Sequence, residues 1–184
     1  AFTDPANNEF FYMMVKAPDN WAYFGQFTAC QELPELPAGF ETNYTGEEEQ
    51  EPEDESTKVI AKLTSDAAIN DYSLVGGWSA ETTMAVTPEI AGITYPVNGE
   101  LPIRFNAVGM GAIMITAPAL TDITGYQYLF VDVMIAYGDA EFFIYAYGAP
   151  IITVKGGNTW TRVVYVNDGN GNFVLPGATG NLSA

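Results

Sequence analysis

Alternating hydrophobic and polar positions mark the rear part of the chain. Between Tyr128 and Ile135 every second residue is aliphatic, and the residues between them are aromatic, polar or Met. Because successive side chains of a strand point to opposite faces, this pattern predicts a strand with one aliphatic and one mixed face. Residues 141–147 repeat the scheme after a turn at Gly138-Asp139, and another strand pattern surrounds Trp160. We interpret these segments as neighbouring strands of a sandwich.

Short strand patterns recur along the chain from residue 57 onward, and turn residues such as Gly, Asn and Asp separate most of them. No long segment has clean helical periodicity. The sequence therefore predicts an all-β fold, a two-sheet antiparallel β-sandwich of jelly-roll type with an N-terminal extension. The predicted strands are Lys58–Leu63, Tyr72–Val75, Thr82–Val86, Pro102–Asn106, Ala112–Thr116, Tyr128–Ile135, Glu141–Tyr147, Ile151–Val154, Trp160–Val166 and Phe173–Leu175.

Charged residues are few, and most of them are acidic. Hydrophobic residues make up 48% of the chain and charged residues 16%, below the roughly 25% usual for soluble domains. The formal net charge is −17, and residues 1–56 contribute most of it with 13 acidic residues against one basic residue. Such a field repels phosphate backbones, so we expect no nucleic-acid partner. No apolar run reaches the roughly 18 residues needed to span a bilayer, so we also expect no membrane insertion. The sparse charge favours a surface that is partly covered by other protein.

The acidic run at 47–55 (EEEQEPEDE) divides the chain. It carries seven acidic residues and no basic one, as in a solvated linker. We therefore expect two parts, an N-terminal arm with its acidic linker at residues 1–56 and a jelly-roll β-sandwich domain at residues 57–184.

The front arm contains a strand pattern that is apolar on both faces, from Phe10 to Val15, and a second candidate strand follows at residues 21–28. Such a strand is typically buried or paired with a partner. We expect it to add to the sheet edge of a neighbouring chain by main-chain hydrogen bonds. The predicted interface residues are Phe10, Phe11, Tyr12, Met13, Met14 and Trp21.

Two passages carry a resemblance to a known family. Residues 119–135 (ALTDITGYQYLFVDVMI) are followed by a Trp-containing strand at residues 158–166 (NTWTRVVYV). Together they resemble the pattern of jelly-roll carbohydrate-binding modules over about a quarter of the chain. The resemblance implies a two-sheet jelly roll, no catalysis, a glycan-contacting aromatic face and a structural calcium ion.

Aromatic residues in the rear strands could form the ligand platform of such a module. Flat rings stack on the C–H groups of sugars, and tyrosine hydroxyls donate hydrogen bonds to them. The same rings could equally be core or a protein interface. The candidate glycan-binding residues are Tyr128, Phe130, Phe143, Tyr145, Tyr147 and Tyr165.

Oxygen-bearing side chains alternate with glycine at residues 167–172 (NDGNGN). Asp168, Asn170 and Asn172 are candidate calcium ligands, because carboxylate and amide oxygens suit this ion. The remainder of an EF-hand loop is missing, since Phe173 and Thr179 stand where glycine and glutamate belong. A glycine-rich hairpin turn explains the same residues without an ion.

Catalytic residue types are few. The chain has no histidine, which removes the commonest general base and the triads that need it. The single cysteine, Cys30, forms neither a disulfide nor a thiolate zinc cluster within the chain, and a packed apolar site is its simplest role. Asp132 and Glu141 are the carboxylates that could approach each other across strands. We expect no enzymatic activity.

The leading hypothesis is a non-catalytic structural subunit of an extracellular or virion assembly, such as a surface filament, a capsid or a capsid-decorating protein. Its partners would be copies of itself or other structural subunits. The alternative is a glycan-binding module whose partner is a polysaccharide. Two N-glycosylation sequons, at Asn43 and Asn181, favour a location outside the cell or on a virion.

Overall fold

A computed structural model gives the backbone of this chain over most of its strand-forming part. It describes residues 10–16, 20–46, 57–62, 72–74, 80–84, 89–90, 93–94, 103–107, 111–116, 125–144 and 149–181. Side chains are described for residues 22–25, 27–46, 125–144 and 149–181.

Every regular element in the described residues is a strand, so the all-β prediction is confirmed for this part of the chain. Each predicted strand from residue 57 onward contains or overlaps an observed one. The strands are β1 (Phe10–Lys16), β2 (Asn20–Cys30), β3 (Glu41–Thr42), β4 (Thr57–Lys62), β5 (Tyr72–Leu74), β6 (Ala80–Met84), β7 (Glu89–Ile90), β8 (Ile93–Thr94), β9 (Ile103–Ala107), β10 (Gly111–Thr116), β11 (Tyr128–Ile135), β12 (Ala140–Ile144), β13 (Pro150–Val154), β14 (Trp160–Asn167), β15 (Phe173–Val174) and β16 (Gly180–Asn181).

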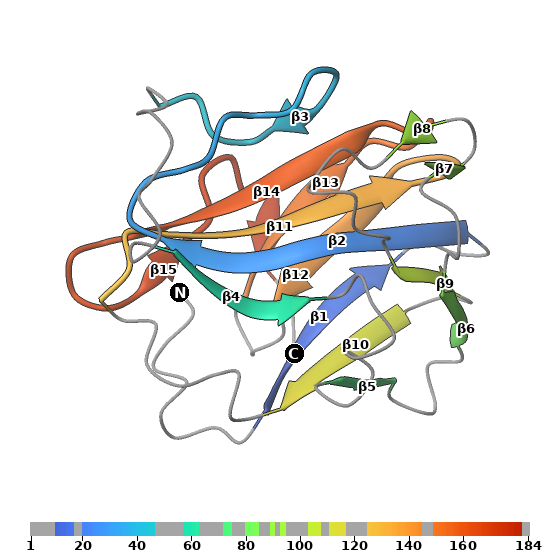
Figure 1. The fold of residues 1–184 in the computed structure, drawn as a ribbon, viewed down its shortest axis with the longest axis horizontal. Helices are drawn as coiled ribbons and strands as arrows, with labels where there is room; N and C mark the ends of the chain where they lie inside the picture. Colours follow the sequence, from blue (N-terminus) through green and yellow to red (C-terminus); the bar gives the residue numbers. More distant parts are fainter. Residues whose placement is uncertain are drawn as a thin grey trace.

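The strands form two large sheets and a small one. The six-stranded sheet has the order β16-β13-β12-β1-β10-β5, and the path of the eight-stranded sheet is β15-β14-β11-β2-β9-β6. Off this path, β4 pairs with β2 and the short β3 pairs with β14. The β3–β14 pair is parallel, whereas the other strand pairs are antiparallel, so the larger sheet is mixed. Figure 1 shows β2, β11 and β14 side by side and β3 beside β14.

The two front strands lie inside these sheets. β1 pairs with β10 on one edge and with β12 on the other, and β2 lies between β11 and β9. The prediction of a free arm is therefore wrong for residues 10–16 and 20–30, because β1 and β2 each have strands of the same chain on both sides. The apolar character of β1 on both faces is the expected composition of an interior strand. The predicted boundary at residue 56 and the acidic run before it lie outside the described residues.

Strands β11 and β14 are buried on both faces. From Leu129 to Ile135 and from Trp160 to Tyr165 every residue is buried. The predicted alternation on β11 holds, since its aliphatic residues form one face and its mixed residues the other. The register places Asp132 opposite Arg162, and Leu129 opposite Tyr165. A sheet that is covered on both sides must have other layers above and below it.

The aliphatic side of the larger sheet faces the smaller sheet. Phe24 of β2 meets Phe142 of β12 edge-on, with ring centroids 5.8 Å apart. Burial raises the pKa of the Tyr165 hydroxyl on β14, and the backbone of Ile144 on β12 opposes part of this shift. Contacts between strands of different sheets support a sandwich-like arrangement.

Within the described residues, no helix is long and apolar enough to cross a membrane.

Candidate functional site

The second face of the larger sheet is covered by a loop. We call Gln31–Gly46 the strap; it leaves the end of β2 and crosses β11 and β14. Leu33 of the strap is buried and packs with Cys30, Phe130 and Val164. Cys30 itself is fully buried, which agrees with a packed apolar role. The mixed face of β11 therefore forms a second, smaller core beneath the strap.

Arg162 is the charged centre of this covered face. Its Nε and Nη2 atoms donate to Asp132 Oδ1 and Oδ2 at 2.8 and 3.1 Å, a two-pronged ion pair. Asp132 has no exposed surface and Arg162 is 3% exposed. A buried charge of this kind is tolerated only when it is paired and hydrogen-bonded. The Nη1 atom of Arg162 also donates to the carbonyl of Pro34 at 3.2 Å, so the pair holds the strap.

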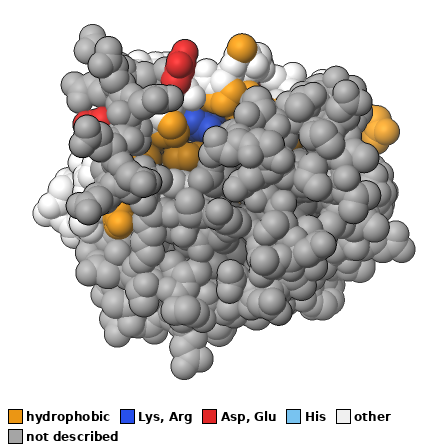
Figure 2. Space-filling view, in the orientation of Figure 1, with side chains coloured by type: hydrophobic (Ala, Val, Ile, Leu, Met, Phe, Trp, Pro, Cys, Tyr) orange, Lys and Arg blue, Asp and Glu red, His pale blue; other side chains and the backbone are white. Residues whose placement is uncertain are grey.

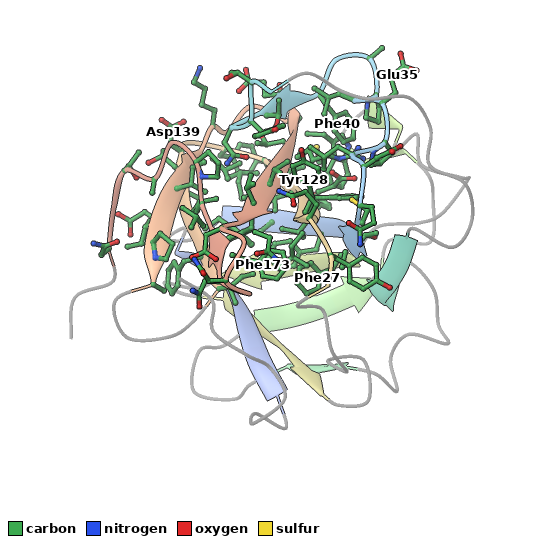
Figure 3. All side chains as sticks on the ribbon, turned by 90° about the vertical axis from the view of Figure 1, so that its left-hand side faces the viewer. Phe27, Glu35, Phe40, Tyr128, Asp139 and Phe173 are labelled. Carbon is green, nitrogen blue, oxygen red and sulfur yellow. The ribbon has the colours of Figure 1, made fainter. Side chains whose placement is uncertain are left out.

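Aromatic rings enclose the guanidinium of Arg162. Its central carbon lies 4.3 Å from the Phe130 ring centroid and 5.9 Å from that of Phe40. Phe40 in turn stacks on Trp160, with centroids 6.0 Å apart. Figure 3 shows Phe40 and Phe27 on opposite sides of the sheet and Glu35 at the outer end of the strap. Figure 2 shows basic atoms among hydrophobic side chains, with acidic side chains above and to the left of them.

Asn43 closes the outer edge of β14. Its Oδ1 accepts from the Val164 backbone N–H at 2.8 Å, and its Nδ2 donates to the Val164 carbonyl at 3.0 Å. The same Nδ2 donates to the carbonyl of Pro176 at 2.8 Å. The carboxamide thus satisfies both backbone groups of Val164, as a neighbouring strand would. The predicted sequon at Asn43 has a structural role in this fold.

The described members of the predicted glycan platform do not share one surface. Tyr128 and Phe130 lie under the strap, and Tyr128 is half-buried with its hydroxyl 3.3 Å from that of Tyr44. Tyr165 is on the opposite, aliphatic face of the same sheet, and Phe143 is on β12 of the other sheet. Phe130, Phe143 and Tyr165 are each at most 1% exposed. The predicted residues Tyr145 and Tyr147 lie outside the described residues.

The predicted calcium ligands form a tight turn between β14 and β15. Asp168 Oδ1 accepts from the backbone N–H groups of Asn170 and Asn172 at 2.8 and 3.2 Å, and Asp168 Oδ2 accepts from Asn172 Nδ2 at 3.1 Å. The Asn172 side chain and the Asn170 backbone lower the pKa of the Asp168 carboxyl. The described residues contain no cluster of three or more His, Cys, Asp or Glu suited to a metal. The arrangement is that of a self-capped turn.

The remaining sequence-predicted residues are separated by the fold. Asp132 is held by Arg162 on the larger sheet, whereas Glu141 is on β12 of the smaller sheet, in register with Lys16 and Thr153. The predicted interface residues are Phe10 to Met14 on β1 and Trp21 on β2. Their side chains lie outside the described ones. The predicted main-chain pairing of β1 with a neighbouring chain is wrong from Met13 to Val15, because β10 and β12 already pair with both edges there.

We expect Cys30 to titrate far above its ordinary range. Burial raises the pKa of its thiol from 9.0 to about 12, and the positive charge of Arg162 opposes this rise. The neutral thiol is thus favoured in the folded state, and its contribution to stability is complete below pH 9.0 and lost as the pH rises toward 12. The free energy of unfolding should fall by about 1.4 kcal/mol per pH unit in this window.

Urea denaturation of the wild type and of Cys30→Ala across the same pH range measures this effect. The difference between the two profiles isolates the thiol from other alkaline groups. Equal slopes for the two proteins would show that Cys30 ionises equally in the folded and unfolded chains.

Comparisons with protein families, with characterised proteins and with solved structures give no match. The function must therefore be argued from the geometry of the chain itself. Sequence reasoning did not identify Arg162 or the edge-closing role of Asn43. A signal for the ion pair was present, because Asp132 and Arg162 are each the single charge in an otherwise uncharged strand. Charged residues at such positions are rarely buried unless paired.

Proposed function

We propose that the chain is a non-catalytic structural subunit of an extracellular or virion assembly, built on a two-sheet β-sandwich of jelly-roll type. Such an assembly would be a surface filament, a capsid or a capsid decoration. The observation that carries this proposal is the burial of β11 and β14 on both faces by the chain's own residues. A sheet held between a second sheet and a strap is a rigid body, which suits a load-bearing subunit.

The polar groups beneath the strap support a structural role. The hydrogen bonds of these groups join parts of the same chain: they are made by the side chains of Arg162, Asp132 and Asn43. A catalytic or ligand-binding group needs donors or acceptors directed at a substrate. No arrangement in the described residues favours the glycan-binding alternative, because the described rings lie on separate surfaces. That alternative stays a prediction.

Charge sets the conditions under which copies would associate. With a net charge of −17, two copies repel each other at long range. Added salt shortens the reach of this repulsion, to about 3 Å at 1 M ionic strength. Calcium ions would weaken it further by binding to acidic groups. Association should therefore increase with salt and with calcium.

Sedimentation velocity of the purified chain over a range of salt concentrations, with calcium or with a chelator, tests the proposal. We expect species heavier than one chain at high salt, and electron microscopy should show regular particles or filaments. A single-chain mass under every condition, together with empty micrographs, would overturn the proposal.

A further inference from the structure

We infer that Asn170, in the turn between β14 and β15, is a site of spontaneous deamidation, in which the backbone nitrogen of Gly171 attacks the Asn170 carboxamide. The product is a carboxylate in place of the amide. The inference concerns a covalent modification of the chain and does not depend on the proposed function. Water is the only other reactant.

Two side chains of this turn are followed by glycine. Asp168 precedes Gly169, and Asn170 precedes Gly171. Glycine has no Cβ, so its backbone nitrogen can approach the preceding side chain closely. Either side chain could therefore close a succinimide ring with that nitrogen. The sequence alone does not choose between the two positions.

The hydrogen bonding of the two glycines distinguishes them. The N–H of Gly169 donates to Asn167 Oδ1 at 2.9 Å. Within the residues that the structure describes, the N–H of Gly171 has no hydrogen-bond acceptor. A nitrogen must give up its hydrogen bond before it can attack, and this costs free energy. The nitrogen that is ready to react is therefore the one beside Asn170.

The two side chains differ in the same direction. The Asp168 carboxylate accepts three hydrogen bonds within the turn, from the N–H groups of Asn170 and Asn172 and from Asn172 Nδ2. The Asn172 side chain lowers the pKa of this carboxyl most and the Asn170 side chain least, so the group stays ionised. An ionised carboxylate resists attack by a nucleophile, whereas the carboxamide of Asn170 is neutral and its residue is exposed.

The reaction balances with one water molecule. The nitrogen of Gly171 forms a bond to Cγ of Asn170, and the bond from Cγ to Nδ2 breaks. The proton of the attacking nitrogen leaves with Nδ2 as ammonia, and a succinimide ring remains. Water then opens the ring. Opening at Cγ gives aspartate, and opening at the main-chain carbonyl gives isoaspartate, whose main chain runs through the former side chain.

Isoaspartate would loosen the turn. It adds a methylene to the main chain between Asp168 and Asn172, whose backbone groups are joined by a hydrogen bond of 2.8 Å from the Asp168 N–H to the Asn172 carbonyl. Both products also place a new negative charge next to the Asp168 carboxylate. We therefore expect the modified turn to hold the short β15 less firmly against β14.

Peptide mass spectrometry tests the inference after the full chain has been kept at mildly alkaline pH in water enriched in heavy oxygen. Ring opening adds one oxygen from this water at whichever residue reacted, and fragmentation of the peptide locates it. We expect the label to appear about tenfold faster at Asn170 than at Asp168, where a hydrogen bond must break first. Asn172 and Asn181, each followed by a bulky residue, should stay unlabelled. Equal or faster labelling at Asp168, or no label at Asn170, would overturn the inference.

Two variants of Asn167 test whether the glycine hydrogen bond makes the choice. Asn167→Ala and Asn167→Asp both lose the bond from Asn167 Nδ2 to the Tyr126 carbonyl, but only alanine removes the acceptor of the Gly169 N–H. We expect labelling at Asp168 to rise about fivefold in Asn167→Ala, which is the contribution of one hydrogen bond to a rate, and to stay at the wild-type level in Asn167→Asp.

Circular dichroism shows whether both variants are folded, and the wild-type measurement is conclusive without them. If labelling at Asp168 is the same in the two variants, the hydrogen bond of Gly169 does not select the reacting residue and the inference is wrong.

Discussion

Replacing Asp132 with alanine is expected to lower the free energy of unfolding by about 3–5 kcal/mol, because it leaves a buried guanidinium without its counter-charge. Arg162 is 3% exposed and donates both of its charge-assisted hydrogen bonds to Asp132. The surrounding rings of Phe130 and Phe40 stabilise the cation but cannot accept these bonds. Chemical denaturation measures the loss directly.

Two further variants separate the charge from the packing. Asp139→Ala removes an exposed carboxylate that accepts one backbone N–H, from Gly156, and should cost less than about 1 kcal/mol. The double variant Asp132→Leu with Arg162→Met replaces the pair by apolar side chains and should recover most of the stability. If Asp132→Ala and Asp139→Ala lower the free energy of unfolding by the same amount, the ion pair does not stabilise the core beneath the strap.

Local sequence patterns predicted the strands and their faces but not their partners. The alternation along residues 128–135 correctly assigned Leu129 and Phe130 to opposite faces, because a period of two is a property of any strand. The same alternation contains no information about which strand lies alongside. β2 was therefore assigned to a free arm, although it pairs with β11 in the middle of the larger sheet.

The strap shows the same limit for the candidate site. Asn43 and Val164 are 121 residues apart, so their hydrogen bonds depend on the whole topology. Asn43 belongs to a sequon, and its triplet gives no sign of an edge-closing role. The Asp132–Arg162 pair was easier to predict, because each residue is the single charge of an apolar strand. Such a charge is rarely buried without a partner of opposite sign. Their two-pronged geometry and the strap above them required the fold.

The face-to-face packing of the two large sheets depends on aromatic contacts such as Phe24 with Phe142. Replacing either ring with alanine should lower the free energy of unfolding by about 3–5 kcal/mol, because both side chains are fully buried and each replacement leaves a cavity. The rings meet edge-on across the sheets at 5.8 Å. In a protein that already lacks one ring, replacing the other should therefore lower the free energy of unfolding by a smaller amount. We expect this difference, the coupling energy, to be about 0.5–1.5 kcal/mol.

A double-mutant cycle on Phe24 and Phe142, measured by urea denaturation, tests this contact and with it the sandwich. Phe173, which is buried on the edge strand β15, provides the matched pair with Phe24. Alanine replacements at Phe24 and Phe173 should add within about 0.5 kcal/mol, because β14 and β11 separate their strands in the sheet. If the effects of the Phe24 and Phe142 replacements on the free energy of unfolding also add, the two rings do not touch in solution. The smaller sheet would then have to pack elsewhere, and the burial of the aliphatic face of β11 would need another cover.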